Sequence, residues 1–168
     1  GNLYKCTYPA DLIYKGTDPN IYKSIMSTAT TGGRAYELQT NKTADNYTDL
    51  AQLISLINKS SDNQFVKEIS AAINVNHLLK AYALEVMCGH WDDYAYNKNN
   101  YILYHDSTTL KFNFVSYDVD NTFGIDWVGV DWAVRDHRKW YNTKSSEKRP
   151  LISKLLAVAE FNQLYLKY

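Results

Sequence analysis

Residues 90–106 read HWDDYAYNKNNYILYHD, and residues 117–127 read YDVDNTFGIDW. Two runs of aromatic and β-branched residues, 101–104 and 112–117, predict the strands of a hairpin. One polar, acid-bearing segment precedes this hairpin, and a second one follows it. Both segments place carboxylates beside large aromatic side chains, where a carboxylate has to be paired, hydrogen-bonded or bound to a metal.

Three helices are predicted before the first of these segments. Asn76 can cap the last helix, and Gly89 is well placed to end it in a left-handed turn. Thr48 or Asn46 can cap the first helix, and Asp62 can cap the second. Apolar residues repeat at helical spacing and predict the buried faces: Leu50, Leu53, Ile54 and Ile57; Phe65, Val66, Ile69 and Ile73; and Leu78, Leu79, Tyr82, Ala83, Val86 and Met87.

Short strands and turns are predicted in the first 40 residues. Residues 2–6 and 12–15 are β-prone, and turns at residues 8–9 and 17–20 interrupt them. A further strand is expected from residue 34 to residue 40. These elements precede the helical middle of the chain and complete the β part of the fold.

A closing helix is predicted to begin at an Arg-Pro pair and to span residues 149–164. Trp127, Trp132 and Trp140 precede it; packing in the core is favoured for them over a platform that stacks on carbohydrate. No internal repeat or linker divides the chain. The sequence therefore predicts a single domain of the α+β class over residues 1–168.

Composition limits the possible partners. Lys and Arg together number 18, as do Asp and Glu, so no net charge favours nucleic acid or an anionic membrane. No stretch approaches the roughly 20 apolar residues that span a bilayer. Cys6 and Cys88 lack metal-type spacing, and we expect them not to be bonded to each other. Glycosylation sequons at Asn41, Asn46 and Asn58 weakly favour an exported protein.

The first polar segment has the spacing of a kinase catalytic loop. His90 and Asp92 form a His-x-Asp pair, and Asn97 follows after four residues. In kinases this Asp accepts or orients the proton of the substrate hydroxyl, and the Asn holds a metal ion. Asp118 follows the hairpin, at the place where a kinase has its metal-binding Asp. The order of helix, catalytic loop, hairpin and metal loop is that of the C-terminal lobe of a kinase.

The runs at residues 90–106 and 117–127 resemble the CotH kinase family. The flanks GNLYK at residues 1–5, YELQTNK at 36–42 and RPL at 149–151 resemble it too, so the resemblance covers essentially the whole chain. It implies a divergent protein-kinase fold that uses ATP and Mg²⁺ to phosphorylate protein Ser/Thr hydroxyls. Members occur in spore coats, on cell surfaces and with dockerin modules, which implies an extracellular, cell-surface or spore-coat location.

The resemblance also implies roles for individual residues. It makes Asp92 the catalytic Asp and Asp118 the metal-binding Asp. Asn97 is implied as a ligand of the metal that accompanies the nucleotide, and Asp120 as an additional metal residue. Arg135 is a candidate for contact with a nucleotide phosphate. Asn121 is a further candidate, with no role attached to it.

Two departures from the family pattern stand out. Asp93 occupies a position where family members often have Gly, and we expect its side chain to face solvent or a basic neighbour such as Lys98. The family domain is also longer at its N-terminus, where a strand should carry the Lys that contacts the nucleotide phosphates. Lys5 and Lys15 lie on predicted strands, but nothing in the sequence marks either for that role. We therefore expect a fragment centred on the C-terminal lobe.

Two other functions stay open. A catalytically silent surface or scaffold module would keep the fold and bind a nucleotide or a partner protein. A metal-dependent glycosyltransferase would use Asp118 and Asp120 to hold a sugar nucleotide. The glycosyltransferase ranks last, because the chain lacks a βαβ run with a Gly-rich turn.

Overall fold

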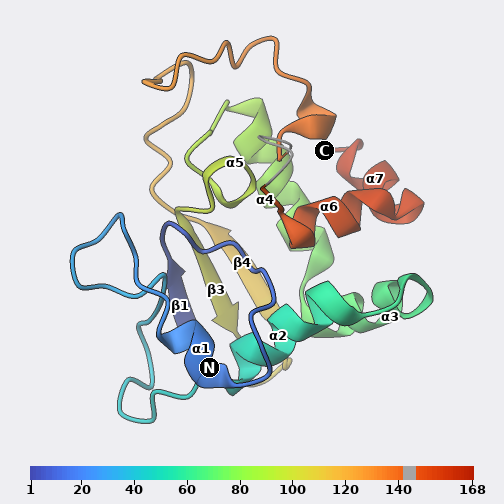
Figure 1. Cartoon of the computed structure of the whole chain (residues 1–168). Coiled ribbons are helices and arrows are strands. Elements are labelled where there is room, and N and C mark those ends of the chain that lie inside the picture. Colours follow the sequence, from blue (N-terminus) through green and yellow to red (C-terminus); the bar gives the residue numbers. More distant parts are fainter. Residues whose placement is uncertain (142–146) are drawn as a thin grey trace.

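The computed structural model describes residues 1–141 and 147–168. Its centre is a four-stranded antiparallel sheet with the strand order β2-β1-β3-β4 (Figure 1). The strands are β1 (Asn2–Cys6), β2 (Tyr36–Leu38), β3 (Tyr101–His105) and β4 (Phe112–Ser116). The predicted hairpin is confirmed as β3 and β4. The predicted strands at residues 2–6 and 34–40 are confirmed as β1 and the shorter β2.

One face of the sheet is buried and the other is open. Tyr4 on β1, Leu103 on β3 and Phe114 on β4 alternate with residues that are at least partly exposed, such as Lys5 and Val115. This alternation is the pattern of a sheet that packs against helices on a single side. The protein is therefore of the α+β class, as predicted.

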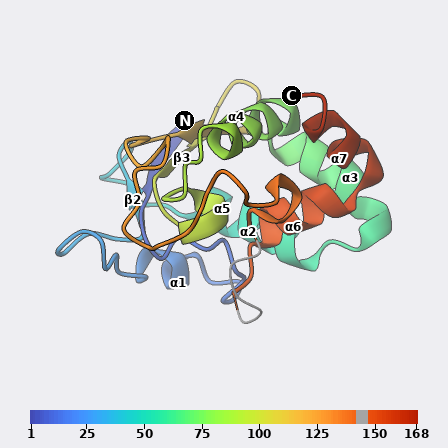
Figure 2. The same cartoon turned by 90° about the horizontal axis from the view of Figure 1, so that it is seen from above.

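Helices cover the buried face of the sheet. Helix α4 packs against β4 and α7, and α2 packs against α3 and α6. Seen from above, the strands lie on one side and α3, α6 and α7 on the other, with α4 and α5 between them (Figure 2). The helices are α1 (Pro19–Lys23), α2 (Thr48–Lys59), α3 (Asp62–Ala72), α4 (Val75–Met87), α5 (Tyr94–Asn97), α6 (Pro150–Ala157) and α7 (Ala159–Tyr165), with a 3₁₀ turn η1 (His137–Lys139).

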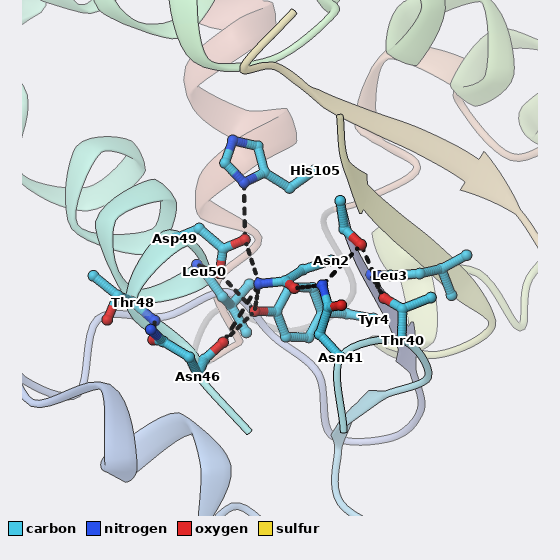
Figure 3. Close-up of polar contacts among 11 residues, drawn as sticks. Asn2, Leu3, Tyr4, Thr40, Asn41, Asn46, Thr48, Asp49, Leu50 and His105 are labelled. Carbon is cyan, nitrogen blue, oxygen red and sulfur yellow. Dashed lines mark hydrogen bonds and ion pairs between the residues drawn. The ribbon is translucent and has the colours of Figure 1, made fainter. Parts of the chain in front are cut away.

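A polar cluster ties the start of α2 to the sheet (Figure 3). The Asp49 carboxylate accepts hydrogen bonds from Tyr4 Oη at 2.6 Å and Asn2 Nδ2 at 3.0 Å. His105 Nδ1, at the end of β3, lies 2.9 Å from the same carboxylate. Burial and the contact with Asp49 raise the pKa of Tyr4. These contacts fix α2 against β1 and β3.

The three middle helices form as predicted, but their N-cap residues differ from those predicted. Asn74 caps α4 by accepting the His77 N–H, so the prediction of Asn76 was wrong. Ser61 precedes α3, and Asp62 is its first residue. At α2 the N-cap residue is Tyr47 and not Thr48 or Asn46, although the Asn46 side chain accepts the Thr48 N–H at 2.9 Å.

The end of α4 was predicted correctly except for one side chain. Gly89 adopts the left-handed conformation, with φ of +68°. Met87, predicted to be buried, is 75% exposed. Cys6 and Cys88 are both free thiols, as expected.

Four other predictions were wrong. Residues 12–15 form no strand: Leu12 has φ of +56° and donates its N–H to the Tyr36 hydroxyl. Residues 17–20 are not a turn, because Asp18 caps the short helix α1, which begins at Pro19. The closing helix is two helices, since Val158 is extended between α6 and α7. Trp127 is 71% exposed, whereas the other two tryptophans of that region, Trp132 and Trp140, are buried as expected.

Candidate functional site

Asp92 lies in the loop between α4 and α5, and four asparagine side chains from outside that loop hold its carboxylate. Its Oδ1 accepts hydrogen bonds from Asn97 Nδ2 at 2.5 Å and Asn99 Nδ2 at 3.0 Å. Its Oδ2 accepts from Asn100 Nδ2 at 2.9 Å and Asn121 Nδ2 at 3.3 Å. Asp92 is only 9% exposed, and amide donors engage both of its oxygens. The four bonds fill the acceptor capacity of a carboxylate.

The local backbone explains why the asparagines converge. Asp93 caps α5 by accepting the Tyr96 N–H at 2.6 Å, and the helix ends after a single turn. Lys98 and Asn100 then adopt left-handed conformations, with φ of +60° and +50°. These reversals wrap the chain around Asp92. Asn99 and Asn100 were not predicted as site residues, although the run of asparagines in the sequence was a signal for them.

The second polar segment packs directly against the first. The hydrogen bond from Asn121 to Asp92 is accompanied by one between His90 Nδ1 and the Asn121 carbonyl, 3.3 Å long. Backbone and tryptophan contacts extend the junction: Phe123 N–H to the Cys88 carbonyl at 2.7 Å, Tyr117 N–H to the Asn100 carbonyl at 3.1 Å, and Trp91 Nε1 to the Ile125 carbonyl at 2.8 Å. The structure thus brings together the two motifs that the sequence singled out.

Asp118 and Asp120 are exposed at the surface of this junction. In residues 1–141 and 147–168, neither carboxylate makes a hydrogen bond or an ion pair. Asp118 has φ of +54°, a conformation that Asp tolerates better than most residues. Burial lowers the pKa of His90, and the charges of Asp92, Asp120 and Asp118 act in the opposite direction.

The donor atoms suit a hard cation. Carboxylate and amide oxygens are the ligands that Mg²⁺ prefers, and one or two carboxylates plus substrate phosphates commonly hold it. Among the described residues, no three His, Cys, Asp or Glu side chains converge as a ready-made metal site. The carboxylates of Asp118 and Asp120 and the amide oxygen of Asn97 are oxygen donors of this kind.

The prediction for Asp93 was wrong. Its side chain is fully buried instead of facing solvent or Lys98. Burial, with the nearby Glu85 carboxyl, raises the pKa of Asp93 well above the usual range. Burial likewise raises the pKa of Glu85 to about 7, and Ser116 Oγ donates a hydrogen bond to it at 2.6 Å. Lys98 instead forms an ion pair with Glu147 at 3.3 Å.

Arg135 lies in an aromatic cage beside α5. Its guanidinium carbon is 5.0 Å from the ring centroid of Tyr96, 5.9 Å from that of Trp132 and 5.7 Å from that of Trp140. Its Nη2 donates to the Trp140 carbonyl at 2.9 Å. The cation is thus used to order the segment after the second motif.

Arg149 is a buried residue that was predicted only as the start of the closing helix. It donates from Nε to the Tyr94 carbonyl at 3.2 Å and from Nη2 to the Tyr96 carbonyl. Its Nη2 is also 3.0 Å from Glu147. Arg149 therefore fastens α5, which follows Asp92, to the start of α6.

The two lysines considered from the sequence differ in position. Lys5 projects from the open face of β1, and its Nζ is 3.1 Å from the hydroxyl of Tyr117 and 4.5 Å from the centre of that ring. Tyr117 directly precedes Asp118. Lys15 forms an ion pair with Asp11 at 3.3 Å. Of the two, Lys5 is the one placed beside the second motif.

Comparison with known proteins agrees with the motifs. Invasin CotH3 of Rhizopus delemar is 26% identical over 130 residues, which cover 75% of this chain and 20% of the relative. Inner spore coat protein H of Bacillus subtilis is 28% identical over 159 residues, which cover 91% of this chain and 41% of the relative. The chain thus spans between a fifth and two fifths of these relatives. The family model described as CotH kinase protein matches residues 1–168, so the chain belongs to the CotH kinase family.

Proposed function

We propose that this chain is the phosphoryl-transfer core of an atypical protein kinase with a divergent kinase fold. It would transfer the γ-phosphoryl group of ATP to Ser or Thr hydroxyls of a protein in a Mg²⁺-dependent reaction. The bond from the γ-phosphorus to the bridging oxygen breaks, a bond to the acceptor oxygen forms, ADP leaves, and the hydroxyl proton passes to a base.

One observation carries this proposal: the hydrogen bond from Asn121 to Asp92, which joins the two motifs into one site. Phosphoryl transfer needs a group beside the acceptor hydroxyl and metal-binding oxygens beside the phosphates. Asp92 supplies the first in this proposal, and Asp118 and Asp120 supply the second. Their exposure leaves the last two carboxylates accessible to a metal-bound nucleotide.

Asn97 has two roles in the proposal: it holds Asp92, and it binds the metal. Its amide nitrogen holds Asp92 Oδ1 in the structure, and it is the most exposed of the four asparagines around that carboxylate. If the amide oxygen of Asn97 held Mg²⁺, one acceptor position on Asp92 would be free. That position is then available for the proton of the acceptor hydroxyl.

In this proposal, the ammonium group of Lys5 contacts the phosphates of the nucleotide. That group lies over the ring of Tyr117 on the open face of the sheet, next to Asp118. A nucleotide approaching across that face meets Lys5 and Asp118 together. We assign to Lys5 the phosphate contact for which the sequence offered no marked residue, and to Arg135 the ordering of the following segment.

A second candidate function is the catalytically silent module. The specific observation in its favour is the set of four amides on Asp92, since a carboxylate whose oxygens are all engaged has no position left for a substrate proton. In that case the asparagine cluster is a structural device that fixes the loop, and the surface binds a partner without chemistry.

The names of the relatives suggest where such a protein works. One relative is called an inner spore coat protein and the other an invasin. We extend this to the chain as a proposal: it acts in a spore coat or at a cell surface, on a protein of that layer. No helix in the described ranges is long and apolar enough to cross a membrane.

A pair of asparagine variants separates the two functions. Asn97→Ala and Asn99→Ala each remove one amide from Asp92 Oδ1, but only Asn97 is proposed to bind the metal. Calorimetric titration with ATP and Mg²⁺ should show at least about tenfold weaker binding for Asn97→Ala, and transfer of radiolabelled phosphate should be lost. Asn99→Ala should bind as the wild type does. Absence of Mg²⁺-dependent ATP binding by the wild type would favour the silent module.

A further inference from the structure

A small cavity of about 170 Å³ lies where the two motifs meet. The C-terminal part of α4 contributes Leu84 and Cys88 to its wall, and the second motif contributes Val119 and Phe123. The Phe123 N–H donates to the Cys88 carbonyl at 2.7 Å, so these two parts of the wall are joined by their backbones. An occupant of the cavity therefore contacts both α4 and the loop that carries Asp118.

His90 also lines the cavity, and one of its ring nitrogens lacks a partner. Its Nδ1 lies 3.3 Å from the Asn121 carbonyl, and because a carbonyl oxygen only accepts hydrogen bonds, Nδ1 carries the proton. In the neutral imidazole, Nε2 is then an acceptor. Nε2 is buried and has no hydrogen-bond partner within residues 1–141 and 147–168. A buried acceptor without a partner is unfavourable, so an occupant that supplies a donor is bound more tightly.

The other polar side chains of the wall are paired within the protein. Ser116 Oγ donates to the Glu85 carboxyl at 2.6 Å, and Thr122 Oγ1 donates to the Val119 carbonyl at 3.1 Å. The surface that the wall presents to the cavity is mainly apolar. The unpaired nitrogen of His90 is therefore the polar group of the wall that an occupant can satisfy.

The size of the cavity limits the occupant to one ring. An apolar cavity of about 150 Å³ stays dry and binds a single benzene molecule. A charged ligand would lose its hydration without gaining an opposite charge in this wall, so a neutral ligand is favoured. Size, apolar wall and unpaired acceptor together indicate a neutral ring with a single donor.

We propose that this cavity binds a small, neutral ring compound that carries one hydroxyl or N–H group, with that donor on Nε2 of His90 and the ring between α4 and the second motif. A compound of one ring fits the cavity as a whole molecule, and we therefore assign the site to a free small molecule. The ligand holds the loop of Asp118 against α4. Binding does not depend on the phosphoryl transfer proposed above, so either proposal can fail alone.

Phenol and benzene test the proposal on the full 168-residue chain, because they share a ring and differ in one hydroxyl. Titrations followed by ligand-observed NMR should show phenol binding at least about tenfold more tightly than benzene, since only phenol supplies a donor to His90. In a cavity without a reachable acceptor the order reverses, because the hydroxyl loses its hydration without compensation. Equal or weaker binding of phenol, or binding of neither compound, would overturn the proposal.

Two matched variants locate the binding. Val119→Phe fills the cavity from a position that is 51% exposed, and Val115→Phe makes the same change at a position that is 42% exposed on the open face of the sheet. Both positions lie at the surface, so both variants should fold, and circular dichroism checks this. Phenol binding should be lost in Val119→Phe and kept in Val115→Phe. Unchanged phenol binding in Val119→Phe would place the ligand elsewhere and reject the site.

A third variant tests the hydrogen bond. His90→Phe keeps an aromatic ring in the wall but removes the acceptor nitrogen, so the preference for phenol over benzene should disappear while benzene still binds. A preference that persists in His90→Phe would contradict the assigned role of Nε2.

N-acetyltyrosinamide separates a free ligand from a side chain of a partner protein, because it carries the phenol ring with peptide groups attached. It should bind more weakly than phenol, since its peptide groups meet the exposed apolar side chains of Leu84 and Phe123. Tighter binding than that of phenol would identify a tyrosine side chain of a partner as the occupant and reject the assignment to a free small molecule.

Discussion

Glu85 offers a quantitative test of the structure around the site. It lies on α4, is 4% exposed, and accepts a hydrogen bond from Ser116 at the end of β4. Because burial raises the pKa of Glu85 from 4.5 to about 7, the folded protein keeps this proton at pH values where the unfolded chain has released it. Replacement by Gln, which is neutral and similar in shape, removes this difference while keeping an oxygen for Ser116.

The sign follows from the direction of the shift. A carboxyl with a raised pKa in the folded state contributes its full stability below pH 4.5 and loses it progressively as the pH rises to about 7. The difference between the two pKa values corresponds to roughly 3 kcal/mol. We expect Glu85→Gln to be more stable than the wild type by roughly this amount at pH 8, and by little at pH 4.5.

Urea denaturation at pH 4.5, 6, 7 and 8 measures the effect. Glu160→Gln, which changes an exposed Glu on α7, serves as the control and should follow the wild type at every pH. Asp93 also favours its protonated form, and because the Glu85 carboxyl helps to raise the pKa of Asp93, Glu85→Gln lowers that pKa and adds to the gain in stability at high pH. A parallel pH dependence of Glu85→Gln and wild type would show that Glu85 is not buried as described.

Asp93→Asn should keep the fold, because Asn still accepts the Tyr96 N–H, whereas Asp93→Ala should lose about 1 kcal/mol with the cap; thermal unfolding compares them. Arg149→Met should lower the free energy of unfolding, measured in urea, by about 3 kcal/mol, because buried carbonyls of α5 lose their donor. A smaller loss would mean that the Arg149 hydrogen bonds are not needed to hold α5. Cys6 and Cys88 should stay reduced, so a non-reducing mass two daltons below the reduced one would contradict the structure.

The parts of the fold predicted from the sequence are those with a strong local pattern. The helices α2, α3 and α4 have apolar positions at helical spacing, and β3 and β4 alternate around a short polar turn. The position of Gly89 was also predictable, because a left-handed helix end favours glycine. Since the two motifs flank these regular elements, their closeness in space followed once the elements formed.

Asp93 shows why the details of the site were harder to predict. The sequence interpretation took residues 92–97 as an extended loop, in which neighbouring side chains point apart and one reaches solvent. The chain instead forms the single turn α5, and Asp93 caps it from inside the protein. A four-residue helix has no repeating pattern, and tertiary contacts such as those with Arg149 hold it in place.

Two errors outside the site have the same origin. Residues 12–15 are apolar enough for a strand, but the Tyr36 hydroxyl takes the Leu12 N–H and no strand lies beside them to pair with. The final helix carries a continuous apolar stripe, yet Val158 is extended and divides it. In both places a distant contact or a packing constraint overrides the local preference, and a single sequence does not reveal such effects.

The claim that Asp118 binds the metal of a nucleotide can be tested by one titration. Asp118→Asn removes the charge but keeps a residue that tolerates the φ of +54° found at this position. Asp62→Asn, at the exposed start of α3, is the matched control. In calorimetry with ATP, the wild type and Asp62→Asn should bind only when Mg²⁺ is present, and Asp118→Asn should bind at least about tenfold more weakly with an unchanged melting temperature. Unchanged Mg²⁺-dependent affinity in Asp118→Asn, or ATP binding by the wild type without Mg²⁺, would contradict the account.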